Sequence, residues 1–143
     1  MAGFLGNYRH QFDAKGRISL PAPFRRGREE EPFVLIHIHS DNLSLYPEEH
    51  WQPVEQELRD MARRQAEFRT QILALTSQAH EVRLDKQGRI LVPDRLRQAV
   101  GLGSEAVIAG ALNRIEIWSP ERFDEAVKGR SPEFQHLVTP IFS

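Results

Sequence analysis

Two segments of the chain place an aspartate four residues before an arginine, with a glycine just ahead of the arginine. They read Phe-Asp-Ala-Lys-Gly-Arg-Ile-Ser-Leu-Pro-Ala-Pro-Phe-Arg at residues 12–25 and Leu-Asp-Lys-Gln-Gly-Arg-Ile-Leu-Val-Pro-Asp-Arg-Leu-Arg at residues 84–97. The carboxylate can accept backbone N–H groups of a turn and pair with the guanidinium, which would fix the turn. A guanidinium beside a glycine also suits a phosphate or the edge of a guanine. Turn fixing and nucleic-acid recognition are therefore both open for these segments.

The two segments are copies of one unit, offset by 72 residues. The identical pairs are Asp13/Asp85, Gly16/Gly88, Arg17/Arg89, Ile18/Ile90, Pro21/Pro93 and Arg25/Arg97. The same offset places Leu35-Ile36 on Val107-Ile108 and Leu43-Ser44-Leu45-Tyr46 on Ile115-Glu116-Ile117-Trp118. We interpret this as duplication of a supersecondary unit, and two copies favour a pseudo-twofold pair that packs as one body.

Each copy has the pattern of a β-rich unit built around its Asp-x-x-x-Arg turn. Asp13, Gly16, Asp85 and Gly88 are expected to shape the turns, because glycine permits the positive φ of a tight hairpin loop. We expect a strand before each turn, a returning strand that ends at proline, a short helix and two further strands. The ranges are 7–13, 18–20, 22–26, 33–39 and 43–46 in the first copy, and 79–85, 90–92, 94–100, 106–109 and 115–118 in the second.

Helical spacing replaces the strand pattern between the copies. Apolar residues recur with charges between them over residues 48–77, which predicts one or two amphipathic helices. We expect Leu58, Ile72 and Leu75 to face the protein's own core or a neighbouring protomer. A shorter helix is predicted at 120–128, and residues 129–143 show no assignable pattern. The predicted organisation is a first domain at 7–50, a helical connector at 51–78, a second domain at 79–122 and a C-terminal helix and tail at 123–143.

Composition excludes several classes of site. The 143 residues include no cysteine, which excludes disulfides, thiolate zinc sites and a cysteine nucleophile and fits a reducing cytosol. We expect neither a secretory signal nor a membrane-spanning segment. The net charge is −1, so a nucleic-acid role must depend on local clusters of bases. Up to residue 28 such a cluster exists, with one acid, Asp13, against Arg9, Lys15, Arg17, Arg25, Arg26 and Arg28.

Two sets of residues have both a functional and a structural interpretation. His37 and His39 would share one face of a predicted strand, with Asp41 and His50 nearby, which could hold a metal in an enzyme. The repeat places Ala109 and Ala111 at those two positions, so we expect no metal site, no cofactor and no enzyme. Arg25 and Arg97 could contact a ligand, although capping the short helix or pairing with a carboxylate explains them equally well.

The doubled motif resembles the MraZ family of bacterial transcriptional regulators, whose halves each have the swapped-hairpin fold of SpoVT/AbrB-like domains. The resemblance is carried by residues 12–21 and 84–93, by residues 115–118 and by the opening Phe4-Leu5-Gly6. It implies a mainly β fold with helices, a duplicated AbrB-like swapped-hairpin β-barrel. It also implies a cytoplasmic, nucleoid-associated protein that assembles into a ring, commonly an octamer, and binds double-stranded DNA at short direct repeats upstream of its own division and cell-wall genes.

The resemblance also implies which residues contact DNA. Arg17 and Arg89 are the expected contacts, joined by Lys15, and the local bases Arg9 and Lys86 are further candidates. The second copy departs from the first by carrying Gln87 where Lys15 stands, so its contact with DNA is expected to be weaker. An alternative is an antitoxin-like or scaffolding protein of the same fold, with a protein partner on the amphipathic segment 51–75.

Overall fold

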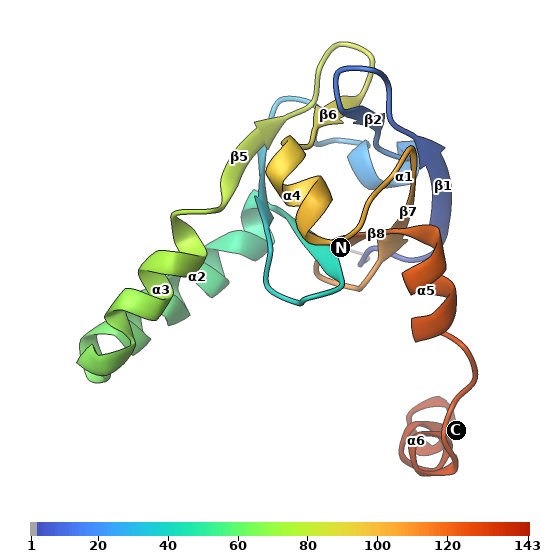
Figure 1. Cartoon of the computed structure of the whole chain (residues 1–143). Coiled ribbons are helices and arrows are strands. Elements are labelled where there is room, and N and C mark those ends of the chain that lie inside the picture. Colours follow the sequence, from blue (N-terminus) through green and yellow to red (C-terminus); the bar gives the residue numbers. More distant parts are fainter. Residues whose placement is uncertain (1–2) are drawn as a thin grey trace.

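A computed structural model describes residues 3–143. Eight strands form a six-stranded antiparallel sheet in the order β1-β7-β8-β4-β3-β5 and a separate antiparallel pair, β2-β6 (Figure 1). Their bounds are β1 Asn7–Gln11, β2 Arg17–Ser19, β3 Pro32–Ile36, β4 Asn42–Pro47, β5 His80–Arg83, β6 Arg89–Leu91, β7 Glu105–Gly110 and β8 Ile115–Trp118. The expected mainly β fold with helices is confirmed.

The two copies are related by a pseudo-twofold axis. Ile18 lies opposite its own repeat equivalent Ile90 in the β2-β6 pair. Ser44 lies opposite its equivalent Glu116 where β4 meets β8 at the centre of the large sheet. The order of the large sheet is also unchanged when each strand is exchanged for its equivalent. The predicted pseudo-twofold pair is therefore confirmed.

The strands exchange partners between the copies. β1 of the first copy pairs with β7 of the second, and β5 of the second pairs with β3 of the first. The strand after each turn does not pair with the strand before it, because β2 pairs with β6, as expected of swapped hairpins. The turn closes only locally, and the ladder hydrogen bonds on both sides of it come from the other copy. This exchange binds the halves into one body.

The repeat offset is not constant along the chain. Leu35 of β3 and Ile108 of β7 both point into the main core, which places these two strands at an offset of 73. The ungapped match of Leu35-Ile36 with Val107-Ile108 is therefore wrong by one residue. A shift of one residue moves every side chain of a strand to the opposite face. Val107 accordingly lies outside the main core, with Trp118 and Phe123.

The main core lies between the large sheet and the β2-β6 pair. Ile18, Leu20, Ile90 and Val92 enter it from the pair, and two short helices close its sides. These helices are α1 Ala22–Arg25, which buries Phe24, and α4 Asp94–Ala99, which buries Leu96. Each begins after the proline that ends the preceding strand, since proline fixes the backbone for a helix start. The β2-β6 pair, which joins the two turns, is therefore anchored on the main core.

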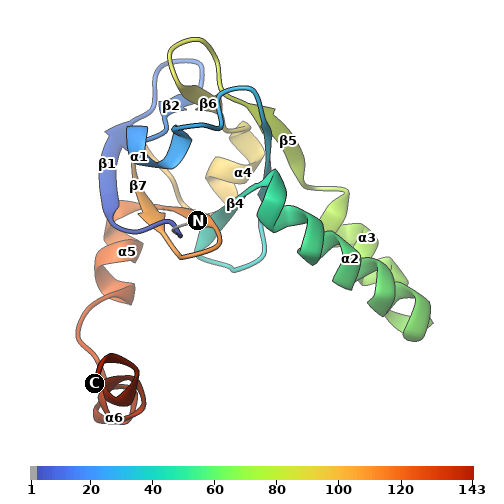
Figure 2. The ribbon, with the colours of Figure 1, turned by 180° about the vertical axis from the view of Figure 1, so that it is seen from behind.

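Two helical arms leave the body on opposite flanks (Figures 1 and 2). The first consists of α2 Glu48–Arg64, the 3₁₀ turn η1 Ala66–Phe68 and α3 Arg69–Thr76. No residue of α2 or α3 is fully buried, so the option that Leu58, Ile72 and Leu75 face the protein's own core is wrong. The predicted helices of the connector are confirmed. They project from the body and leave much of their surface exposed.

The second arm contains residues 129–143, for which no element was predicted. It consists of α5 Pro120–Ala126, α6 Pro132–Val138 and the 3₁₀ helix η2 Thr139–Phe142. The arms begin alike: Trp51 packs against Tyr46 with tilted rings at 5.7 Å between centroids, and the equivalent Phe123 lies edge-on to Trp118 at 6.0 Å. The signals for α6 were present in Ser131-Pro132, a helix cap followed by proline. No helix within residues 3–143 is long and apolar enough to cross a membrane.

The strand expected to carry two histidines ends too early for them. β3 stops at Ile36, and the chain turns there, with the N–H of Asn42 bonded to the carbonyl of His39 at 3.5 Å. His50 lies on α2 and meets the ring of Phe4 edge-on. The premise of two histidines on one strand face is therefore wrong. Residues 3–143 contain no group of three or more His, Asp or Glu side chains placed to hold a metal ion.

Candidate nucleic-acid interface

Both Asp-x-x-x-Arg turns lie at the same end of the molecule, side by side, away from the two arms (Figure 1). They are brought together by the β2-β6 pair, where Arg17 lies opposite Leu91 and Arg89 lies opposite Ser19. The sequence placed the turns 72 residues apart, and the exchange of strands makes them neighbours. One surface therefore presents both copies of the motif.

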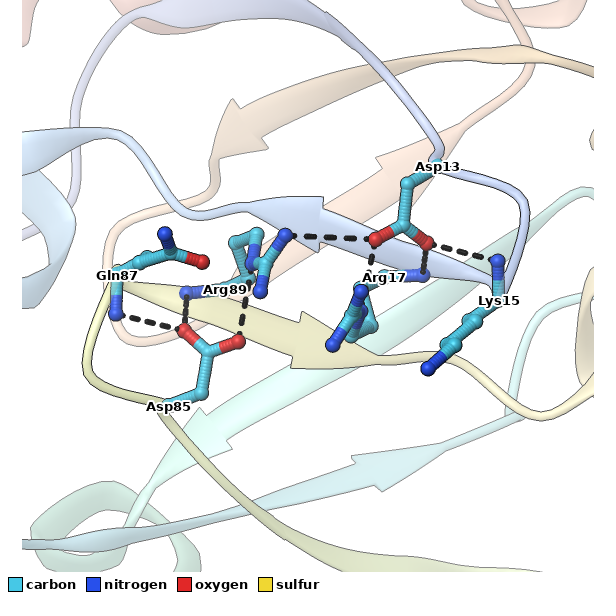
Figure 3. Close-up of polar contacts among 6 residues, drawn as sticks. All are labelled: Asp13, Lys15, Arg17, Asp85, Gln87 and Arg89. Carbon is cyan, nitrogen blue, oxygen red and sulfur yellow. Dashed lines mark hydrogen bonds and ion pairs between the residues drawn. The ribbon is translucent and has the colours of Figure 1, made fainter.

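In the first turn, Asp13 organises the backbone and the arginine together (Figure 3). Its Oδ1 accepts the backbone N–H groups of Lys15 and Arg17, both at 2.9 Å. Its Oδ2 accepts the Nε–H of Arg17 at 2.7 Å. These contacts, led by the backbone N–H of Arg17, lower the pKa of Asp13 to about 2. The carboxylate is therefore charged at neutral pH and holds the guanidinium by its Nε edge.

The second turn repeats this geometry. Asp85 Oδ1 accepts the backbone N–H groups of Gln87 and Arg89, both at 2.9 Å, and Oδ2 accepts the Nε–H of Arg89 at 2.9 Å. The backbone N–H of Arg89 is again the main cause of a lowered pKa, here that of Asp85. Each aspartate thus accepts two backbone N–H groups and one Nε–H within its own turn. Gly16 and Gly88 have φ of +85° and +77°, the positive region that glycine was expected to supply.

One contact breaks the symmetry of the two turns. The Nη1 of Arg89 lies 3.4 Å from Asp13 Oδ2, so this arginine is shared between both carboxylates (Figure 3). Within the described chain, the hydrogen bonds of the Arg17 side chain pass through Nε alone. The side chain of Arg17 is 33% exposed and that of Arg89 25%. Arg17 thus presents both terminal nitrogens, whereas Arg89 has one of them engaged.

A further pair of arginines supports the turns from the opposite copy. The Nε of Arg25 donates to the carbonyl of Leu20 at 2.9 Å, and its equivalent Arg97 donates to Val92 at 3.2 Å. A Cβ atom added to Gly88 would lie 2.7 Å from Arg25 Nε, so each short-helix arginine packs on the glycine of the other turn. Of the roles suggested for these arginines, the structure shows pairing with a carboxylate at Arg97, which contacts Asp94. The repeat identified the residues but not the contact.

The remaining candidate bases do not all gather at the turns. Lys15 and Lys86 are exposed within them. Arg9 lies on β1 and its Nη2 pairs with Asp124 of α5 at 2.8 Å, so the structure does not bring it to the turn residues. Each turn thus combines a neutral Asp–Arg pair with one exposed lysine. This surface offers oriented hydrogen-bond donors and two positive charges, which suit the base edges and phosphates of a nucleic acid.

Comparison with known proteins is consistent with this surface. The chain matches the family described as "MraZ protein, putative antitoxin-like" over residues 4–73 and 75–137. It is 36%, 37% and 39% identical to the proteins named Transcriptional regulator MraZ of Desulforamulus reducens, Moorella thermoacetica and Thermus thermophilus. These alignments cover 96%, 94% and 87% of this chain and the same shares of the relatives. Such relatives are named for a regulatory role and not an enzymatic one, and the chain belongs to the MraZ family.

Proposed function

We propose that this chain is a transcriptional regulator that binds double-stranded DNA through its two Asp-x-x-x-Arg turns. The observation that carries the proposal is the placement of both turns on one surface, each with an ionised aspartate holding an arginine by Nε. An arginine held in this way keeps its terminal nitrogens directed outward without losing freedom on binding. Preorganisation of this kind lowers the entropic cost of association.

The residue types fit a division between reading bases and holding the backbone. The two terminal nitrogens of Arg17 match the O6 and N7 acceptors of guanine, a pairing that contributes about 1–3 kcal/mol of discrimination. Lys15 and Lys86 are point charges suited to phosphate. Arg89 is placed to make a weaker contact than Arg17, because Asp13 engages one of its nitrogens.

A chain with net charge −1 and two exposed lysines in its turns should bind DNA weakly as a single copy. We infer that several copies act together, as a ring of identical chains, commonly eight, that faces short direct repeats. Once one protomer is bound, the next contact is intramolecular, and such linkage raises affinity by about 10²–10⁴. The regulator would repress its own division and cell-wall gene cluster by covering the promoter. That role places it at the nucleoid in the cytoplasm.

A fluorescence-anisotropy titration tests the proposal. The full chain is titrated against a duplex that carries the direct repeats upstream of its gene, and against the same duplex with the repeats scrambled. We expect Arg17→Ala to lower affinity for the repeats at least tenfold and to lower affinity for scrambled DNA much less, through the loss of one positive charge. Arg17→Lys keeps the charge but not the paired nitrogens, so it should lose the same discrimination. Equal affinity of the unmodified chain for both duplexes would refute sequence-specific recognition.

A second candidate function follows from the exposed α2–α3 arm. The matched family's description includes the words antitoxin-like, and an amphipathic arm that buries no residue could hold a protein partner. This function predicts a stoichiometric complex with an unrelated protein that survives purification. It also predicts that substitutions on the arm, and not at Arg17, abolish activity. Purification of the chain from its own cells, with mass spectrometry of the isolated complex, separates the two functions.

A further inference from the structure

The C-terminal helix exposes a row of large apolar side chains. Phe134, Leu137, Ile141 and Phe142 are 47%, 72%, 75% and 83% exposed. Their spacing of three, seven and eight residues places them along one side of the α6–η2 helix. We call these four residues the tail stripe. Four of the remaining positions of the helix are polar: Glu133, Gln135, His136 and Thr139.

This helix is specified locally but is too short to be stable alone. Ser131 caps it by accepting the N–H of Phe134 at 3.1 Å, and Pro132 occupies its first position. α6 has seven residues, whereas isolated helices shorter than about 12–15 residues are marginal in water. Short helices in proteins are stabilised mainly by burial of their apolar face. The tail stripe therefore requires an apolar surface to cover it.

A surface of suitable chemistry lies on the other arm. A hollow of about 300 Å³ opens along α2. We call it the α2 groove, and its lining residues are His50, Pro53, Val54, Glu57, Leu58, Met61 and Asn113. Val54, Leu58 and Met61 recur along α2 at helical spacing, and the side chain of Met61 is 38% exposed. The groove is thus lined by a row of apolar side chains, and one short helix is long enough to cover that row.

The two surfaces have opposite charge. Over its whole length α2 carries five acids against the three bases Arg59, Arg63 and Arg64, and so has net charge −2. Beyond Ala126 the chain carries the bases Lys128 and Arg130 and one acid, Glu133. Lys128 also lies 3.9 Å from Glu125, in an exposed pair that costs little to break. Charge complementarity of this kind favours association of the tail with the groove.

The placement of the arms decides which copy supplies the partner. Helices α2 and α6 lie on opposite flanks of the body (Figures 1 and 2), so the tail helix does not cover the α2 groove of its own chain in this arrangement. Two different patches on one chain form a heterologous, head-to-tail contact, which closes into a ring when the rotation between neighbours permits. The Asp-x-x-x-Arg turns lie away from both arms, so every copy would leave them free.

We propose that the tail helix of one chain docks its stripe into the α2 groove of a second copy, and that this contact joins neighbouring subunits. The inference rests on the proposed function for its ring, and it names the surfaces that build the ring. Leu137 and Ile141 would insert between Val54 and Met61. Lys128 and Arg130, which precede the tail helix, would lie close to the acidic residues of α2.

The test compares two variants of the full chain by light scattering coupled to gel filtration. The tail variant combines Phe134→Ser with Ile141→Ser, and the groove variant combines Val54→Lys with Met61→Lys. Each should fall from the mass of the wild-type assembly to that of one chain. An equimolar mixture should give a dimer, because one intact tail meets one intact groove. The matched controls are His136→Ala, on the polar part of the tail helix, and Leu73→Lys, a 57% exposed site on α3 outside the groove.

Each outcome decides the inference. Loss of assembly in both variants, unchanged controls and a dimer in the mixture support it, provided that circular dichroism shows folded chains. Wild-type mass in either variant overturns it, and so does a mixture that stays monomeric. A monomeric wild-type chain would mean that the tail is covered within its own chain or by another protein, which overturns it too. If the variants keep the wild-type mass and bind the repeats normally, this inference fails and the proposed function stands. If the wild-type chain assembles through these surfaces but does not bind DNA, the proposed function fails and this inference stands.

Discussion

The guanidinium of Arg89 in the second turn reaches the carboxylate of Asp13 in the first, with Nη1 3.4 Å from Oδ2. Asp13 thus serves two arginines, its own partner Arg17 and the partner of the other aspartate. The duplicated turns are therefore coupled and are not equivalent. Because of this coupling, we expect the two arginines to contribute unequally to the recognition of DNA.

Arg17→Ala is expected to weaken binding to the direct repeats more than Arg89→Ala does. Arg17 offers both terminal nitrogens, so its removal should cost about 1–3 kcal/mol per reading contact. Arg89 offers fewer free donors and should cost less than about 1 kcal/mol. Anisotropy titrations of both variants at one fixed salt concentration measure the difference. Equal losses would show that the Asp13–Arg89 contact does not persist on DNA.

Asp13→Asn is expected to weaken the preference for the repeats and to strengthen binding to DNA of any sequence. Asparagine can still accept the two backbone N–H groups, but its amide nitrogen cannot accept the Nε–H of Arg17. Both arginines then lose their common anchor, and the surface gains one positive charge. Affinity for scrambled DNA should rise at low salt, and the preference for the repeats should fall about tenfold or more. Asp94→Asn, which removes an equal negative charge from α4, is the matched control and should leave the preference for the repeats unchanged.

The first turn should stay closed well into the acidic range. The pKa of Asp13 is lowered to about 2, below its unfolded value, so its contribution to stability is present above about pH 4 and is lost as pH falls through 2. Titration of the Asp13 carboxyl carbon by NMR should give a midpoint near 2. Any change of DNA affinity between pH 5 and 8 must then come from other groups. A midpoint near 4 would contradict the turn geometry.

Gly88→Ala is expected to destabilise the chain more than Gly16→Ala. Both positions have positive φ, which costs an L-residue about 1–2 kcal/mol. At Gly88 the new methyl would also lie 2.7 Å from Arg25 Nε, whereas at Gly16 the nearest atoms, on Arg97 and Val92, lie at 3.2 Å. Gly27→Ala is the control, because its φ is +77° and nothing lies within 4 Å. Urea unfolding should rank the losses as Gly88, then Gly16, then Gly27.

Glu49→Gln is expected to cost about 1–3 kcal/mol of the free energy of unfolding. Arg28 is 8% exposed, pairs with Glu49 and lies over the ring of Phe4, so neutralising the acid removes one charged partner of a buried base. The side-chain hydrogen bond from Arg28 lowers the pKa of Glu49. The contribution of the pair is therefore full above about pH 4.5 and declines as pH falls below it. Thermal unfolding at pH 7 and pH 3 should show a smaller deficit of the variant at pH 3 than at pH 7.

The sequence by itself determined what is encoded locally. The Asp-x-x-x-Arg turns, their glycines, the short helices after Pro21 and Pro93, and the amphipathic connector all follow from turn chemistry and from hydrophobic period. The repeat also located the residues that share an environment, including the two aspartates. Short-range rules suffice there because the contacts span at most a few residues.

Tertiary structure decided which copy each strand pairs with. Both copies carry the same apolar pattern, so the sequence does not distinguish a strand that returns onto its own copy from one that crosses to the other. The same degeneracy hid the one-residue shift at β7 and the packing of Arg25 on Gly88. The exposed tail stripe was hidden for another reason. A helix that covers no part of its own chain has no partner in the sequence to reveal its purpose.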